Sequence, residues 1–192
     1  KAHYGCRVAE VERRAGLWRA YADGGAVIAE APVLILANAT DAGRFTVAAH
    51  LPLRAARGQV SHLPAAAGSA PDIVVCRLGY VTPAIDGLRC AGATFSIDDG
   101  ETALRTADHA ENLARLDFIL PGHAKGIQPA DLGGRVGFRP LAPDRLPMVG
   151  AVADATAIEA SHPSRPLAEM PRHPGLYVIN GFGARGIVWS AL

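Results

Sequence analysis

Cysteine is scarce in this chain of 192 residues, and the three that occur, Cys6, Cys76 and Cys90, are far apart. An odd number at wide spacing supports neither a disulfide framework nor a paired Cys-x-x-Cys metal site. The seven histidines are scattered as well, without the His-x-x-x-His or Glu-x-x-His spacing of metal ligands. We therefore expect no metal site.

Long apolar runs are also missing. The longest, such as residues 31–37, are far shorter than the roughly 20 residues that a membrane-spanning helix needs. No charged start followed by an apolar stretch marks a secretory signal. Because 49% of the residues are hydrophobic, the chain can still bury a sizeable core. We expect a soluble, globular, cytoplasmic protein.

A strong net charge is missing too, since the formal charge is only +1 at pH 7. Nucleic-acid binding is normally indicated by a clustered basic face, so the charge gives no argument for it here. The basic residues are nearly all arginine, which reflects either coding composition or a use in phosphate contacts. The sequence leaves both explanations open.

A glycine-rich stretch near the end of the chain is the most informative motif. The apolar run 176–180 leads into Gly181-Phe-Gly183-Ala184-Arg185-Gly186, which predicts a buried strand turning into a helix. Such a turn exposes backbone N–H groups and a positive helix end to an electron-rich ligand. The alternative is a tight connection alone, because glycine is the residue that tolerates positive φ most easily.

The spacing of this turn matches Gly-x-Gly-x-x-Gly, the dinucleotide fingerprint, which requires a further strand and an acidic residue about 20 positions later. The chain reaches Leu192 before either of them. We therefore expect the turn to contact a part of a flavin or nicotinamide other than its pyrophosphate.

A second cluster spans residues 137–150, where Arg139 is followed by Pro140, a proline-studded turn and Met-Val-Gly. Together with residues 57–60, 79–83 and 92–94, this cluster resembles the FAD-dependent amine oxidases of the D-amino-acid oxidase and glycine oxidase family. Three phrases, Arg-Gly-Gln-Val-Ser-His-Leu-Pro, Gly-Tyr-Val-Thr-Pro and Asp-Arg-Leu-Pro-Met-Val-Gly, are similar to the branch that oxidises a modified wobble uridine of tRNA.

The resemblance implies an α/β fold with α+β character, in which part of an FAD-binding Rossmann-like domain is joined to a mixed, largely antiparallel substrate domain. Residues 1–52 correspond to part of the FAD-binding domain and residues 53–138 to the substrate-binding domain. Residues 139–192 return to the FAD-binding domain. The family's opening segment, which cradles the FAD pyrophosphate, has no counterpart before Lys1. We therefore expect a fragment that is inactive and colourless when isolated, without bound FAD.

The resemblance also implies roles for particular residues. Arg139 corresponds to the arginine that grips the carboxylate of the substrate, and Tyr80 can add a hydroxyl to the same anion. An ion pair between Arg139 and a structural acid such as Asp144, and a packing role for Tyr80, are the alternatives. The residues expected to contact the cofactor are Asn38, Arg57, Gly58, Gly181, Gly183, Ala184, Arg185 and Gly186.

Two of these cofactor predictions carry a qualification. At Ala39 the family has a glycine that touches the flavin nucleotide, so a direct contact at the Asn38–Ala39 turn is in doubt. Arg57 lies in a long alternating segment, 53–63, and is equally well explained as an ordinary strand residue.

Periodicity predicts the remaining elements. A broad apolar stripe with helical period indicates a helix over residues 101–120, ended by Pro121-Gly122. Residues 161–174, which are rich in proline, are expected to form a loop. Strands are expected at residues 5–11, 17–22, 26–29, 33–37, 53–63, 73–77, 80–83 and 88–93.

Three functions remain open at this point. The first is oxidation of the carboxymethylaminomethyl group of wobble uridine in tRNA, which leaves an aminomethyl group and glyoxylate. The second is oxidation of free glycine, sarcosine or a D-amino acid by an oxidase or dehydrogenase of the same family. The third is a non-catalytic substrate-binding or interaction module.

Overall fold

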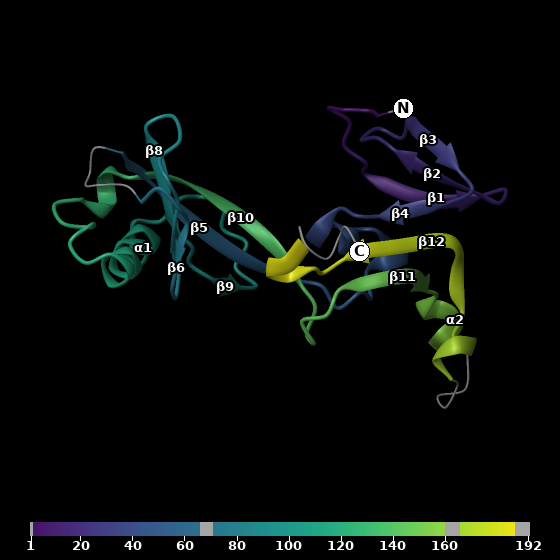
Figure 1. Ribbon diagram of the computed structural model, residues 1–192. Coiled ribbons are helices and arrows are strands. Elements are labelled where there is room, and N and C mark those ends of the chain that lie inside the picture. The colour runs from purple at the N-terminus through teal and green to yellow at the C-terminus, as the bar shows by residue number, and fades with distance from the viewer. Residues whose placement is uncertain (1, 66–70, 160–165, 187–192) are drawn as a thin grey trace. The chain divides into compact units, whose positions relative to one another are not determined.

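The computed structural model describes residues 2–65, 71–159 and 166–186, and the chain folds into two compact units (Figure 1). Unit 1 combines residues 1–54 with residues 140–192, and unit 2 comprises residues 55–139. The domain boundaries predicted from the sequence, after residues 52 and 138, lie close to the boundaries between the two units, after residues 54 and 139. The cofactor and substrate roles of the two units remain predictions.

Unit 1 contains an antiparallel sheet of β1 (Glu10–Arg14), β2 (Leu17–Tyr21) and β3 (Val27–Ala31). The turn between β2 and β3 uses Gly24 and Gly25, both at positive φ, which glycine adopts without steric cost. The first strand begins at Glu10, so its predicted position at residues 5–11 is wrong. Register explains the shift, because each residue from Glu10 to Arg14 pairs with one of β2.

A second sheet of unit 1 has the order β11-β12-β4, with β12 in the centre. It is formed by β4 (Leu34–Leu36), β11 (Met148–Ala153) and β12 (Arg172–Asn180). β12 runs parallel to β4 and antiparallel to β11. The carboxyl ends of β4 and β12 therefore lie side by side. The predicted loop 161–174 ends earlier than expected, because β12 already begins at Arg172.

The core of unit 1 is almost wholly apolar and lies between its sheets and two short 3-10 helices, η1 (Ala39–Arg44) and η2 (Thr46–Ala48). Burial of these side chains is the main stabilising contribution to the unit. Short helical segments complete the described part of the unit: α2 (Ala155–Glu159), η4 (Leu167–Glu169) and η5 (Gly183–Arg185). The buried residues of the core are Val11, Trp18, Leu36, Ala42, Phe45, Ala48, Val152, Leu176 and Val178.

Unit 2 is built on a six-stranded sheet with the path β10-β5-β8-β7-β6 and with β9 paired to β5. β5 (Arg54–Pro64) is the long central strand, and β10 (Gly133–Leu141) is its neighbour on one side. The remaining strands are β6 (Val75–Cys76), β7 (Tyr80–Val81), β8 (Leu88–Gly92) and β9 (Ser96–Ile97).

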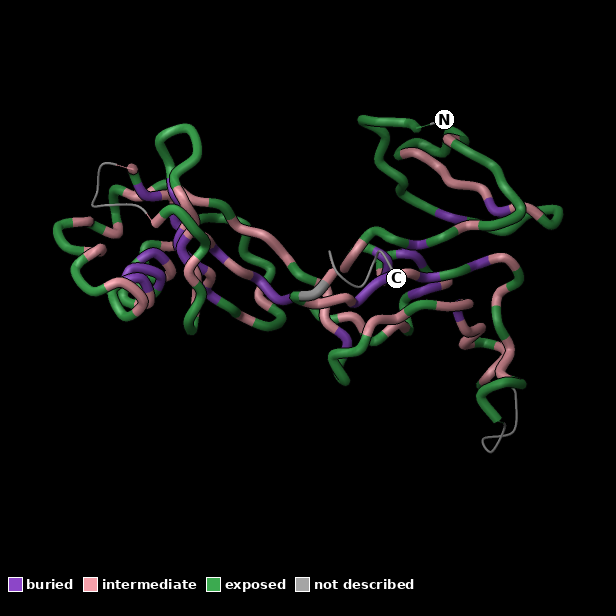
Figure 2. Tube along the Cα trace, in the orientation of Figure 1, coloured by how far each residue is buried: buried purple, intermediate pink, exposed green. Residues whose placement is uncertain are grey.

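In the described part of the unit, the helix α1 (Thr106–Ile119) packs against β7 and β8 (Figure 1), and Figure 2 shows buried positions along it. Leu113 and Leu116 meet Leu63, Val81 and Ala91 in the apolar core of unit 2. The helix starts five residues later than predicted, with η3 (Pro129–Asp131) following it. Among the described residues, no helix is long and apolar enough to cross a bilayer.

Candidate functional site

Unit 2 contains a pocket of about 730 Å³, which lies in the size range of small-molecule sites. Four arginines line it together with Tyr80 and His62, namely Arg57, Arg115, Arg135 and Arg139. Among the described residues that line the pocket, none is aspartate or glutamate. The pocket is therefore suited to an anionic ligand.

Strand alternation explains which side chains reach the pocket. Along β5, the even-numbered Gly58, Val60 and His62 line it, whereas Gln59 and Ser61 are fully buried and, of the odd-numbered positions, Arg57 alone is a lining residue. Successive side chains of a strand point to opposite faces, so the two sets face opposite sides of the sheet. The hydrogen bonds of Ser61 and Gln59 run to α1 and to the segment before it. The even-numbered side chains of β5 thus face the pocket from the sheet side opposite α1, while Arg115 of α1 also reaches the pocket lining.

β10 follows the same rule. A Cβ atom on Gly134 would lie 2.9 Å from Cε1 of His109 on α1, so this position faces the helix. Arg135, Gly137 and Arg139 then point to the pocket side, and all three line it. Gly137 separates the arginines, and a Cβ atom there would meet no other atom within 4 Å. The strand therefore presents two guanidinium groups with open space between them.

Tyr80 lies in the same pocket and is half-buried. Burial raises the pKa of its phenol, with a smaller contribution from Cys90, while the charges of Arg139 and Arg135 act against the rise. Tyr80, Arg135 and Arg139 all line the same pocket. The raised pKa keeps Tyr80 a neutral hydrogen-bond donor at physiological pH.

Arg139 forms no hydrogen bond or ion pair with another described residue of unit 2 and is exposed to the pocket. The carboxylate of Asp144 instead accepts a hydrogen bond from the backbone nitrogen of Leu146, at 2.9 Å. Arg139 is therefore available to a ligand as far as its own unit is concerned.

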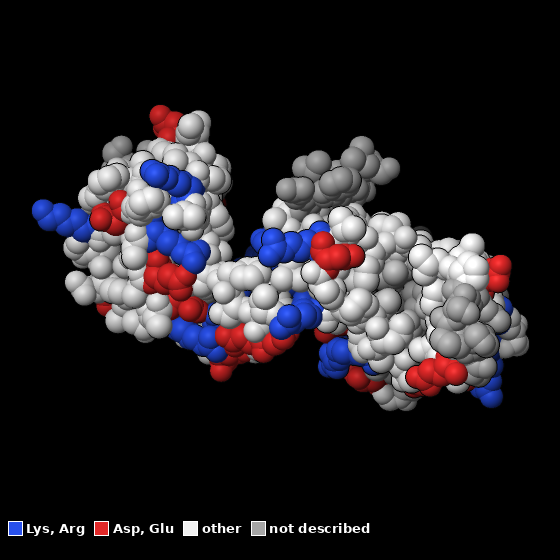
Figure 3. All heavy atoms as spheres, turned by 90° about the horizontal axis from the view of Figure 1, so that it is seen from below, with Lys and Arg blue, Asp and Glu red and all other residues white. Residues whose placement is uncertain are grey.

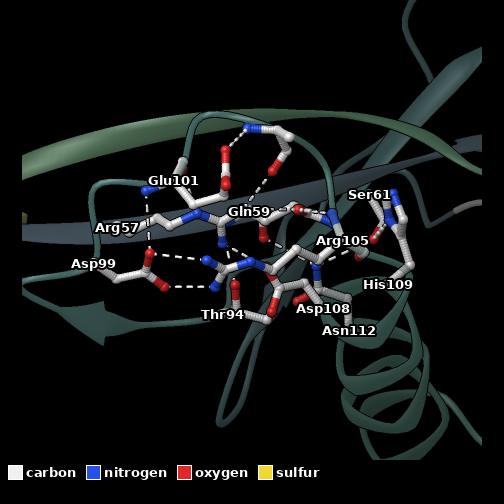
Figure 4. A network of polar contacts seen from close by, with 11 residues as sticks. Arg57, Gln59, Ser61, Thr94, Asp99, Glu101, Arg105, Asp108, His109 and Asn112 are labelled. Carbon is white, nitrogen blue, oxygen red and sulfur yellow. Dashed lines mark hydrogen bonds and ion pairs between the residues drawn. The ribbon is translucent and has the colours of Figure 1, made fainter.

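Arg57 has a role different from the predicted cofactor contact (Figure 4). Its side chain is fully buried, and all three nitrogens donate hydrogen bonds within unit 2. The acceptors are the carbonyl oxygens of Glu101 and Ala103, the carboxylate of Asp108 and the amide oxygen of Gln59. The predicted cofactor contact is wrong because side chains alternate along β5, and Arg57, like Gln59 and Ser61, is on the side that bonds to α1 and the segment before it.

These bonds also explain why α1 starts late. The carbonyl oxygens of Glu101, Ala103 and Arg105 accept side-chain hydrogen bonds from Arg57 and Gln59. Residues 101–105 therefore wrap the buried guanidinium and amide groups and form no helical turn. Sequence periodicity could not reveal this, because the competing partners lie more than 40 positions away.

The network continues along β5 to α1 (Figure 4). Ser61 Oγ lies 2.7 Å from Nδ1 of His109, and Asn112 donates to Ser61 and to the carbonyl of Gln59. Burial lowers the pKa of His109, so the ring is neutral at physiological pH. Among the residues that the structure describes, Nε2 of His109 and Oδ1 of Asn112 find no hydrogen-bond partner. This pairing of serine and histidine lies inside the core and is structural.

The candidate site in unit 1 consists mainly of backbone groups, whereas the pocket of unit 2 presents side chains. The predicted glycine turn follows β12, with Gly181 and Gly183 both at positive φ. Asn180 is buried, and its side chain donates to the carbonyl of Ala39 at 2.7 Å and accepts from the backbone nitrogen of Gly181 at 2.8 Å. One side chain thus ties together the ends of β4 and β12.

Ala39 adopts φ +55°, a conformation that favours glycine. The turn at Ala39 therefore has the left-handed backbone for which glycine is the usual residue. The neighbouring Asn38 is exposed and lines a pocket of about 280 Å³ with Arg7, Asp41 and Arg44. Carboxyl ends of parallel strands are a common place for nucleotide cofactors. The backbone geometry fits such a ligand.

The end of the glycine turn is described only in part. Gly183–Arg185 form η5, Ala184 is exposed, and Gly186 continues with helical backbone angles. A Cβ atom on Gly183 would come no closer than 3.9 Å to Leu141, so the space around this glycine is open. The predicted helix over residues 187–192 and the side chain of Arg185 lie outside what the structure describes.

Sequence reasoning missed Arg115 and Arg135. Arg115 donates to the carbonyl of Ala93 at 2.6 Å and pairs with Glu111 on α1. Arg135 carried a signal that could have been used, because it precedes Arg139 by four positions, a spacing that puts both side chains on one face of a strand. On the face drawn in Figure 3, basic and acidic side chains are interspersed over the surface. The arginine cluster is defined by the residues that line the pocket.

Comparison with known proteins supports a family assignment. The whole chain, residues 1–192, matches the family described as FAD dependent oxidoreductase. It is 57% identical, over all 192 residues, to the tRNA 5-methylaminomethyl-2-thiouridine biosynthesis bifunctional protein MnmC of Aromatoleum aromaticum. The protein of the same name from Azoarcus sp. is 54% identical over the same length. The chain spans 30% of the length of each of these relatives.

Solved structures show the same fold. Glycine oxidase from Geobacillus kaustophilus matches with a TM-score of 0.67 and 19% identity, over 96% of this chain and 44% of the oxidase. Iminodiacetate oxidase from Chelativorans sp. matches with a TM-score of 0.61 and 24% identity, over 95% of this chain and 45% of the oxidase. These matches confirm the predicted mixed α/β fold, and the chain belongs to the FAD-dependent oxidoreductase family that its motifs indicated.

Proposed function

We propose that this chain is part of a flavoenzyme that oxidises the carboxymethylaminomethyl group of wobble uridine in tRNA. The products are the aminomethyl group and glyoxylate. The observation that carries the proposal is the pocket of unit 2, where Arg139 and Tyr80 face a cavity without any lining acid. The printed function of the relatives, biosynthesis of a methylaminomethyl-thiouridine in tRNA, supports this choice of substrate. A tRNA substrate places the enzyme in the cytoplasm.

Arg139 binds the carboxylate of the glycine-like arm. Its planar guanidinium can hold both carboxylate oxygens at once, which fixes the orientation of the arm as well as its charge. Orientation matters because the C–H bond next to the amine must face the electron acceptor. Tyr80, which stays protonated, donates a further hydrogen bond to the same carboxylate.

The chemistry that bound FAD would supply is removal of a hydride from the carbon next to the amine, after which water would cleave the oxidised carbon–nitrogen bond. The residues of unit 1 proposed to hold it are Asn38, Gly181, Gly183, Ala184, Arg185 and Gly186, chiefly through backbone groups at the ends of β4 and β12. Gly58 is the further contact proposed in unit 2. The side chain of Arg57 does not fit this role, because its nitrogens already donate within the core.

The test uses the complete, FAD-loaded protein that contains this chain. We expect undermodified tRNA to reduce the flavin rapidly under anaerobic stopped-flow conditions, with glycine, sarcosine and D-alanine as poor substrates. The apparent affinity for tRNA should fall as salt rises, because each neutralised phosphate releases counterions. Rapid, salt-insensitive reduction by a free amino acid, with none by tRNA, would show that the substrate is an amino acid.

Substitutions of Arg139 test the carboxylate contact. Arg139→Lys keeps the charge and loses the planar fork, and Arg139→Ala loses both, so reduction rates should fall in that order while FAD stays bound. A lost charge-assisted hydrogen bond costs about 1.5–3 kcal/mol, and misorientation adds a further loss of about 100-fold. An unchanged rate in Arg139→Ala would mean that the substrate carboxylate lies elsewhere.

A further inference from the structure

The pocket of unit 2 holds more positive charge than one carboxylate requires. Arg139 alone can satisfy both oxygens of a carboxylate, and Tyr80 adds a donor. Arg135 lines the same pocket, and no hydrogen bond or ion pair links it to another described residue of unit 2. Arg115 differs, because its guanidinium is already used by Ala93 and Glu111. Arg135 is therefore a second available cation.

The geometry of β10 separates the two available arginines. Arg135 and Arg139 are four residues apart on one strand face, which places their Cα atoms about 13 Å apart at the usual rise per residue. Gly137 lies between them, with open space where a side chain would project. A ligand can therefore lie along β10 with one anionic group at each arginine.

We propose that Arg135 forms a second anion subsite that binds a phosphate of the nucleotide bearing the reactive arm. This inference rests on the proposed function, since a wobble nucleotide carries its carboxylate on the base and its phosphates on the ribose. The base and ribose separate the two anions, as Gly137 separates the two arginines. The subsite makes β10 a selector for nucleotides over free amino acids.

The nearby charges are consistent with this assignment. Arg135 and Arg139 both line the pocket beside Tyr80, which carries no negative charge while its phenol is protonated. No aspartate or glutamate is among the described lining residues, and a bound dianion would relieve the repulsion between the cations. His62 lines the pocket as well and adds no negative charge.

The experiment compares three ligands in the complete, FAD-loaded protein: carboxymethylaminomethyl-uridine, its 3′-monophosphate and its 5′-monophosphate. Titration calorimetry measures each dissociation constant for the unsubstituted protein, Arg135→Gln and Arg135→Lys. Arg14→Gln is the matched control, because Arg14 is exposed on β1 and is not a lining residue of the pocket. This substitution also removes one positive charge. Thermal denaturation checks that each variant is folded.

We expect one monophosphate to bind about tenfold more tightly than the nucleoside, as one charge-assisted hydrogen bond provides. Arg135→Gln should abolish this advantage and leave the affinity for the nucleoside within about twofold. Arg135→Lys should retain part of the advantage, and Arg14→Gln all of it. The arms with 3′- and 5′-phosphate identify which phosphate occupies the subsite.

Two outcomes overturn the subsite. One is the absence of a phosphate advantage in the unsubstituted protein or its persistence in Arg135→Gln. The other is an equal loss of affinity for nucleoside and nucleotide in Arg135→Gln, which would mean that Arg135 binds the carboxylate. Failure of the proposed function looks different: the flavin stays oxidised with every nucleoside, nucleotide and tRNA, while Arg135-dependent phosphate binding persists.

Discussion

The candidate sites of units 1 and 2 differ in the groups they offer a ligand: backbone groups in unit 1 and side chains in unit 2. In unit 1 the features that fit a cofactor are backbone groups, held by positive φ values at Ala39, Gly181 and Gly183. In unit 2 the pocket is lined by long charged side chains, chiefly Arg135 and Arg139. A backbone site requires particular conformations, whereas a side-chain site requires a rigid sheet that aims each side chain.

The cores of the two units also differ in how many polar side chains they bury. Among the described residues, the only buried polar residue of unit 1 is Asn180, and the rest of its core is apolar. Unit 2 buries a polar network beneath its pocket, formed by Arg57, Gln59, Ser61, Thr94, His109 and Asn112. A satisfied buried network makes a structure rigid, and each missing partner is costly. Unit 2 should therefore be the more sensitive unit to single polar substitutions.

The largest effect is expected for Arg57→Ala. The substitution leaves the carboxylate of Asp108 and two carbonyl groups without their donor inside unit 2. Breaking such a buried pair costs about 3–5 kcal/mol. Hydrogen exchange resolved by mass spectrometry should show faster exchange in residues 55–139 and little change in unit 1. Arg105→Ala is the control, since its pair with Asp99 is more exposed and is expected to contribute about 1 kcal/mol or less.

Asn180→Ala tests whether one buried side chain has the same importance in unit 1. It removes the bonds to Ala39 and Gly181, and we expect a loss of about 1–3 kcal/mol in the free energy of unfolding. Exchange should increase at the ends of β4 and β12. Asn38→Ala should change stability by less than about 0.5 kcal/mol, because Asn38 is exposed and its side chain caps no helix. Equal effects of the two substitutions would contradict the bridging role.

Ala39→Gly should stabilise the turn slightly. A left-handed conformation costs alanine about 1–2 kcal/mol, and the added freedom of glycine in the unfolded chain offsets about 0.5–1 kcal/mol of that gain. Thermal denaturation should therefore show an unchanged or slightly higher midpoint. A clear loss of stability would mean that the Ala39 methyl group contributes packing that outweighs its backbone strain.

The smallest effect concerns pH. Burial lowers the pKa of His109 below the ordinary histidine value of 6.5, so the ring is neutral in both the folded and the unfolded chain at higher pH. Below 6.5 the unfolded chain takes up the proton first, and the stability of unit 2 should fall as the pH drops from about 7 toward 5. His109→Gln should reduce this slope in urea titrations. A slope that does not change would exclude His109 as its origin.

Local patterns predicted much of this protein. The glycine turn after β12, the strand alternation of β5 and the helix ending at Pro121-Gly122 each depend on neighbours a few residues away. Such patterns predict elements well because backbone preference and periodicity are local properties. Short elements such as β9 and α2 were missed, since two to five residues carry no periodic signal.

The sequence by itself determined the family, the mixed α/β class and the presence of an arginine suited to a carboxylate. Only the tertiary structure decided which arginine is exposed in the pocket. Arg57 and Arg139 both lie in strands and both line the pocket, but Arg57 is fully buried and bonded to Asp108 of α1, whereas Arg139 is exposed. Strand parity is fixed by pairing with distant strands and by the face that α1 covers, and neither is encoded locally.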